Sequence, residues 1–266
     1  MKKKIVYLFW AIIIIVIGAF LKDQMQSLDP QGAQIQNIYS FLGDKYLDYC
    51  EGMPLYEDKE ANFDNLSDEV KMCLAFKLLN EDNINNDTLD KVKKKNICTL
   101  TEGKDFRVDD DSTEKTVGCS VNVIDEKALS DAYAKIFGKK IQNTIDFNLS
   151  GSKICYFDEE GNRYVCGNTV VQNLQIGWAP TTYRLITKAK EKGNKIYLYD
   201  YFLAINNDKC YLTNTGSKEN TKCSESIGKK TQFNDKFVKK HGQKYLHIFE
   251  KDSNGEYHWA SSSLVK

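Results

Sequence analysis

The chain has 266 residues, and its 37 Lys and Arg balance its 37 Asp and Glu, so its formal net charge is zero. This balance argues against a nucleic-acid-binding protein, which usually shows a basic excess or a basic stripe. Three prolines and 16 glycines are too few to predict long disordered linkers. The chain is long enough for one large domain or two small ones.

An uncharged apolar stretch, IVYLFWAIIIIVIGAFL, runs from Ile5 to Leu21. A helix of this length spans roughly 26 Å, at the short end for a bilayer core of about 30 Å. Three lysines precede the stretch, and only Lys22 and Asp23 follow it directly, which predicts a cytoplasmic N-terminus. We therefore expect a single-pass membrane protein with an extracytoplasmic bulk. Secretion after cleavage of this stretch as a signal peptide is the alternative.

All the cysteines lie beyond the apolar stretch, and their number is even: Cys50, Cys73, Cys98, Cys119, Cys155, Cys166, Cys210 and Cys223. An even set on the exported side of a membrane suggests disulfides. Cys155 and Cys166 flank a turn centred on Glu160-Gly161, which places them opposite each other in a hairpin and predicts a bond between them. Cys210 and Cys223 flank a polar loop and form a second candidate pair. Zinc is the alternative, but the chain has no CxxC pair.

Residues 23–118 predict a membrane-proximal helical region after the anchor of residues 1–22. Helical spacing of apolar residues predicts helices from about Pro30 to Cys50 and from Asn65 or Ser67 onward. A third, short helix is expected from Thr88 to Lys95. The acidic stretch of residues 102–116 predicts a solvated loop, because it lacks the glycine and the ligand order of a calcium-binding EF-hand loop.

Residues 119–266 predict an α+β domain. A helix from Ile124 to Phe137 has a regular apolar stripe, with Asp125 able to cap its start and Gly138 its end. The hydrophobic period then changes to two, typical of strands. The predicted strands are Thr144–Leu149, Lys153–Phe157, Arg163–Gly167, Thr182–Lys190, Lys195–Ile205, Cys210–Thr213, Lys244–Lys251 and Glu256–Ser262. We expect this helix to pack across one face of a curved, mostly antiparallel sheet.

Several segments resemble those of N-terminally anchored extracytoplasmic proteins from low-GC Gram-positive bacteria that are themselves uncharacterised. They are the helix end IFGKK, the Cys-bounded hairpin, the tyrosine-rich strand and the closing hairpin KYLHIFEKDSNGEYHWASSSLVK. The similarity covers roughly residues 120–266 and lies in style and element order. It implies a cell-envelope protein, for which a cystatin-like or NTF2-like sheet is a reasonable expectation. It carries no catalytic residues.

Recognisable catalytic and cofactor motifs are missing from the sequence. It has no nucleophile elbow, no zinc-protease motif, no P-loop and no dinucleotide fingerprint. Only His247 and His258 suggest a metal, because the last hairpin is expected to place them on one face. A third ligand is not evident, so we predict no metal site, no cofactor and no catalytic residue.

Tyr197, Tyr199 and Tyr201 alternate along one predicted strand and therefore share a face. The apolar Ile196, Leu198 and Phe202 occupy the other face, which a helix is expected to cover. A tyrosine combines apolar area with a hydrogen-bonding tip, so the three predict a binding surface, with Trp178 nearby. Cross-strand packing inside a curved sheet is the competing interpretation.

These observations favour a membrane-anchored extracytoplasmic binding or structural module over an enzyme. Its expected partners are the lipid bilayer, through Ile5 to Leu21, and cell-wall glycan or an envelope protein. One alternative is a cell-envelope enzyme acting on wall glycan or peptide. Another is a subunit of a membrane assembly, in which the helix predicted from Pro30 packs on a partner.

Overall fold

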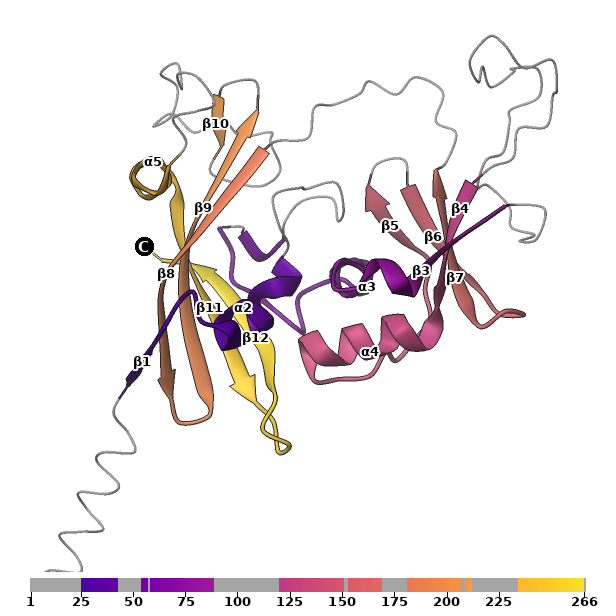
Figure 1. The fold of residues 1–266 in the computed structure, drawn as a ribbon, viewed down its shortest axis with the longest axis horizontal. Coiled ribbons are helices and arrows are strands. Elements are labelled where there is room, and N and C mark those ends of the chain that lie inside the picture. The colour runs from indigo at the N-terminus through magenta and orange to yellow at the C-terminus, as the bar shows by residue number, and fades with distance from the viewer. Residues whose placement is uncertain are drawn as a thin grey trace, which may run out of the picture.

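The computed structural model describes residues 25–42, 54–56, 58–88, 120–150, 153–168, 181–206, 209–211 and 234–265. This part of the chain is α+β, with helices between two antiparallel sheets (Figure 1). None of its helices is long and apolar enough to span a bilayer. The stretch from Ile5 to Leu21 lies outside the described residues.

The larger sheet has the strand order β1-β8-β9-β11-β12-β2, and a seventh strand, β10, also pairs with β9. Every pairing in it is antiparallel. Its strands are β1 (Gln26–Leu28), β2 (Ala61–Asn62), β8 (Thr181–Lys192), β9 (Lys195–Asn206), β10 (Lys209–Tyr211), β11 (Gln243–Lys251) and β12 (Tyr257–Leu264).

The smaller sheet has five antiparallel strands in the order β3-β4-β7-β6-β5. They are β3 (Ile84–Thr88), β4 (Ser120–Asp125), β5 (Phe147–Ser150), β6 (Lys153–Asp158) and β7 (Arg163–Asn168). The β6–β7 hairpin places Cys155 directly opposite Cys166. The two form a disulfide with a Cα–Cα distance of 4.0 Å, as the turn between them predicts.

The α-helices are α2 (Ala33–Tyr39), α3 (Asp68–Lys77), α4 (Glu126–Phe137) and α5 (Asp235–His241), and the 3-10 turns are η1 (Ser40–Leu42), η2 (Pro54–Tyr56) and η3 (Glu81–Asn83). The side chain of Ser67 caps α3 by accepting a hydrogen bond from the Val70 amide. In the same way Asp125 caps α4, and Gly138 ends that helix in the left-handed conformation at φ 63°.

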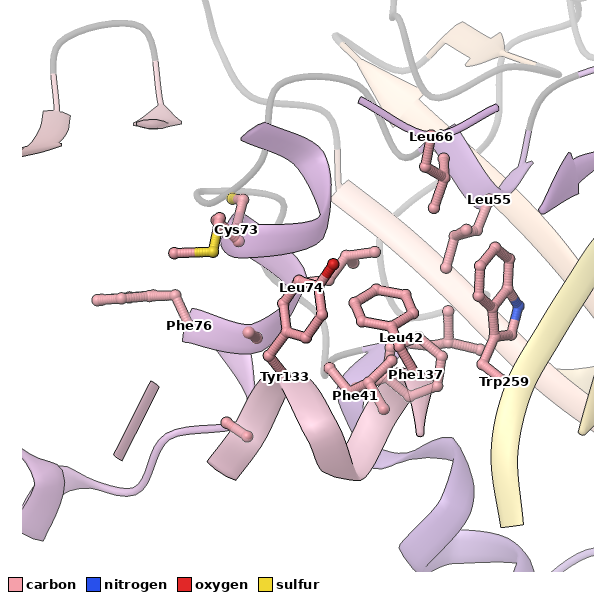
Figure 2. Close-up of a cluster of buried hydrophobic side chains, with 14 of the residues drawn as sticks. Phe41, Leu42, Leu55, Leu66, Cys73, Leu74, Phe76, Tyr133, Phe137 and Trp259 are labelled. Atoms are coloured by element: carbon pink, nitrogen blue, oxygen red, sulfur yellow. The ribbon is translucent and has the colours of Figure 1, made fainter. Parts of the chain in front are cut away.

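The main core lies between the two sheets and is built around α3 and α4. Figure 2 shows Phe137 from α4 and Leu42 from η1 beside Trp259 of β12. The rings of Phe137 and Trp259 are 5.9 Å apart, edge to face. The same cluster includes Phe147 and Tyr164 of the smaller sheet. A continuous apolar layer therefore joins the sheets, and its burial is the main stabilising contribution.

The strands predicted after residue 140 do not form one sheet. Strand β7 pairs with β4 and β6, whereas β8 pairs with β1 and β9. The helix α4 consequently has a sheet on either side, with contacts to β4 and to β12. The α+β class and the antiparallel pairing are confirmed, while the single curved sheet is replaced by two.

The membrane-proximal region differs from the helical one expected. The helix predicted from Pro30 begins at Ala33 and passes into a 3-10 turn at Ser40; residues 43–50 lie outside the described chain. Where the third helix was expected to begin, Thr88 is the last residue of strand β3, and residues 89–95 are not described. The short strands β1 and β2 complete the larger sheet, so this region contributes to both sheets.

Candidate functional site

The two faces of the larger sheet have different chemistry. On β9, the side chains of Ile196, Leu198, Asp200 and Phe202 are buried on the inner face, toward the helices. The intervening Tyr197, Tyr199 and Tyr201 are half-buried on the outer face. The predicted alternation therefore holds, but it places one acidic residue in the core.

Asp200 is the centre of a buried hydrogen-bond network and has 0% exposure. Its Oδ1 lies 3.2 Å from His247 Nε2 on β11. Its Oδ2 accepts a hydrogen bond of 2.7 Å from the Tyr56 hydroxyl of η2 and another from the Tyr39 hydroxyl of α2. The carboxylate thereby joins the larger sheet to two segments that precede it by more than 140 residues.

The network continues from His247 to β12. His247 Nδ1 lies 2.6 Å from Ser262 Oγ, and the indole Nε1 of Trp259 donates to the same oxygen at 2.8 Å. Both ring nitrogens of His247 therefore have a partner within the protein, Nε2 in Asp200 and Nδ1 in Ser262.

The protonation of these groups follows from their surroundings. Burial alone would raise the pKa of the Asp200 carboxyl, but positive charge on His247 and hydrogen bonds from His247, Tyr39 and Tyr56 lower it below its ordinary value. Burial and the Asp200 charge raise the pKa values of Tyr39 and Tyr56 well above 10.0. The charge of Arg184, whose Cζ lies 5.1 Å from the centroid of the Tyr56 ring, opposes this rise.

The Ser262–His247–Asp200 combination has the residue types of a hydrolytic triad, but not its accessibility. Ser262 is 1% exposed, and its oxygen is engaged by Trp259 and His247. A nucleophile must reach the substrate, so this network has a structural role. The members of this network lie on three strands. The one sequence signal that could have indicated the network was Asp200, an acidic residue among the inward-facing apolar residues of β9.

The outer face of the larger sheet carries a group of residues that we call the lysine–tyrosine face: Lys188, Lys190, Tyr197, Tyr199 and Lys244. Lys188 pairs directly with Tyr199 across the β8–β9 ladder, and Lys190 with Tyr197. The ammonium groups of Lys188 and Lys244 lie 5.6 and 5.1 Å from the Tyr199 ring centroid. In the described chain, none of these three lysines forms an ion pair with a carboxylate.

Of the other predicted surface residues, Tyr201 lies farther along the same outer face, directly opposite Lys244. Tyr201 packs at one end of the sheet in a small cluster with Leu203 and with Phe237 and Val238 of α5. Trp178 lies outside the described residues, so its predicted place beside the tyrosines stays a prediction. The uncovered aromatic area therefore centres on Tyr197 and Tyr199.

The cavities that border the core of the described chain include the following two. One, of about 760 Å³, lies between α2, the end of α4 and the β11–β12 hairpin, with Lys135, His258 and Trp259 in its lining. The other, of about 720 Å³, is lined by residues of α2 and β8, including Tyr39 and Arg184. The first lining also contains Asp131, Asp252 and Glu256, and His258 Nε2 lies 3.3 Å from Asp252 Oδ2. The second lining contains one carboxylate, that of Asp235, and no histidine.

The structure does not bring His247 and His258 together. A register shift between Ile248 and Phe249 separates them: His247 pairs with Ser262 in the buried network, whereas His258 pairs with Glu250 near the turn of the hairpin. The Nδ1 of His258 lies 3.0 Å from the Lys135 carbonyl oxygen at the end of α4. Within the described chain no three His, Cys, Asp or Glu side chains are grouped to hold a metal ion.

The cysteines follow the predicted disulfide chemistry as far as they are described. Cys73 of α3 is disulfide-bonded, as are Cys155 and Cys166, and no described cysteine is free. The predicted pair of Cys210 and Cys223 stays a prediction, because the Cys210 side chain and Cys223 lie outside the described part. A cysteine–histidine catalytic pair is thus absent from the described residues.

No protein-family model, no curated protein and no solved structure matches this chain.

Proposed function

We propose that this chain is a membrane-anchored extracytoplasmic binding module whose lysine–tyrosine face contacts an anionic component of the cell envelope. The observation that carries the proposal is the position of the half-buried Tyr197 and Tyr199 on the outer sheet face, among three lysines that form no ion pair with a carboxylate of the described chain. Anchoring comes from the apolar stretch Ile5 to Leu21, which follows a lysine run.

The chemistry of this face suits binding. Tyrosine rings provide contact area at a small loss of side-chain entropy, and they are enriched in interfaces. Unneutralised ammonium groups attract anionic partners and fix their orientation. Strand β9 is paired on both sides, by β8 and β11, so the two rings are held on a rigid support.

Accessibility separates this proposal from an envelope enzyme of the acyl-transfer type, which needs an exposed nucleophile. In the described chain the Ser262 hydroxyl is buried and no cysteine is free. These observations favour the binding module over an acyl-transfer enzyme.

Binding to isolated envelopes tests the proposal. Full-length protein in a neutral detergent is incubated with envelopes, and the bound fraction is measured for wild type and for the Tyr197→Ala/Tyr199→Ala variant. Truncation of two central contact residues should weaken binding by at least about tenfold. Tyr156→Ala, a half-buried tyrosine of the smaller sheet, should bind as wild type does. Equal binding by the double variant, with an unchanged circular-dichroism spectrum, would overturn the proposal.

A further inference from the structure

We infer that the anionic component is the headgroup layer of the membrane in which the chain itself is anchored. This inference rests on the proposed function and names the partner of the same face. It follows from the position of strand β1, from the position of Lys190 and from the distribution of charge on the larger sheet.

The first described strand leads the chain to one particular end of this sheet. Strand β1 runs antiparallel to β8, with Gln26 opposite Glu191 and Leu28 opposite Ala189 (Figure 1). Its N-terminal end therefore lies beside the end of β8 that turns into β9. Leu21, the last apolar residue of the predicted anchor, is four residues before Met25, so their Cα atoms are at most about 14 Å apart.

The lysine–tyrosine face starts at this same end. The Lys190 ammonium lies 3.7 Å from the Met25 sulfur, and Lys190 is the direct partner of Tyr197. Met25 is 44% exposed and is the most exposed large hydrophobic side chain of the described residues. The polar headgroup region adds about 5–7 Å to each side of the hydrocarbon core, so a connection with a reach of up to about 14 Å is long enough to cross it.

Two acidic residues near this end are already paired. Glu250 is paired with Lys195 at 2.6 Å, and Glu191 binds Lys251 at 3.4 Å and the Tyr257 hydroxyl. Lys188, Lys190 and Lys244 add positive charge to the outer face. Cations attract an anionic lipid surface, and tyrosine is enriched at the level of lipid headgroups, so both residue types of the face fit the same partner.

A wall polymer is the competing anionic partner. It has similar phosphate or carboxylate chemistry, but it does not require the binding face to begin beside the anchor. The placement of Lys190 against Met25 favours the bilayer surface. A sheet lying on the membrane would also use the outer side chains of β8, β9 and β11 together, since they form one continuous face.

Lysine acylation in vesicles distinguishes these partners. Full-length protein is reconstituted in phosphatidylcholine vesicles with or without phosphatidylglycerol, exposed to a water-soluble acylating reagent and mapped by mass spectrometry. Anionic lipid should slow acylation of Lys188, Lys190 and Lys244 by about fivefold, the attraction expected for one lysine at such a surface. The exposed Lys59 should react equally in both vesicles. Salt at about 0.5 M should remove the protection, because it screens the attraction.

A charge reversal provides the matched control. Lys190→Glu should reduce the protection of Lys188 and Lys244 in anionic vesicles, whereas Lys59→Glu should leave it unchanged. Equal acylation of the face in both kinds of vesicle would overturn the inference. Protection by added anionic wall polymer in neutral vesicles, without protection by anionic lipid, would overturn the inference but keep the proposed function. Protection by neither would contradict both.

Discussion

His247 and Asp200 meet on the inner face of the larger sheet, with Nε2 3.2 Å from Oδ1 and no exposed surface on either side chain. Tyr39, Tyr56 and Ser262 complete their hydrogen bonding. A buried carboxylate is costly unless its partners are in place. This pair therefore requires α2 and η2 to dock on the sheet in one arrangement.

Replacement of the carboxylate should be strongly destabilising. Asp200→Ala leaves His247, Tyr39 and Tyr56 with unsatisfied polar atoms in the core and should lower the free energy of unfolding by about 3–5 kcal/mol. Urea unfolding followed by circular dichroism measures this loss. Asp131→Ala, at an exposed position of α4, should change stability by no more than about 0.5 kcal/mol. A loss below about 1 kcal/mol for Asp200→Ala would contradict the role of the network.

Acid should act through the same carboxylate. His247 and the tyrosine hydrogen bonds hold the folded-state pKa of Asp200 below its ordinary value of 3.8, despite burial. The stabilisation is therefore fully present above pH 3.8 and is lost as the pH falls through the lower, folded-state pKa. The free energy of unfolding, measured across this pH range, should fall less in Asp200→Asn than in the wild type. An equal fall in both proteins would mean that the acid sensitivity arises from groups other than Asp200.

Lys77 should make the stability of the fold depend on pH in the alkaline range. Burial, together with the charge of Arg184, lowers the pKa of Lys77 from 10.5 to about 8. The unfolded chain then binds more protons between pH 8 and pH 10.5, so this group makes stability rise with pH across that window. Lys77→Met should remove this rise and increase stability at pH 7 by about 1–3 kcal/mol. The exposed Lys140→Met is the control, and an undiminished rise in Lys77→Met would be the contrary result.

The Cys155–Cys166 disulfide should be recovered by peptide mapping without reduction. In the chain-entropy account, closing a loop with a sequence separation of 11 stabilises the fold by about 3 kcal/mol. The Cys155→Ala/Cys166→Ala variant should lose about that amount in urea unfolding. Free thiols at both positions in the native protein would refute the bond.

The best predicted elements are those whose signals lie close together in sequence. Helix α4 was predicted with both caps, since Asp125, the apolar stripe and Gly138 lie within one short segment. The Cys155–Cys166 hairpin was predicted for the same reason, because the turn between the cysteines sets their register. The alternation on β9 likewise separated its tyrosines from Ile196, Leu198 and Phe202.

Features that depend on distant pairing were not predictable. The division of the strands into two sheets depends on which neighbours β7 and β8 choose, and local periodicity carries no such information. The bulge after Ile248 changed the partner of His258 without a signal in the hairpin sequence. The lysines of the outer face became a group only when the register placed Lys188 and Lys190 opposite Tyr199 and Tyr197.

Photocrosslinking in intact cells tests the central claim, that this face meets the envelope. Tyr199→p-benzoylphenylalanine places a photoreactive group in the lysine–tyrosine face, and Tyr156→p-benzoylphenylalanine places the same group on the smaller sheet. After illumination, the account predicts covalent adducts of lipid or wall material at position 199 and several-fold fewer at position 156. An absence of adducts at position 199, or equal yields at both positions, would contradict it.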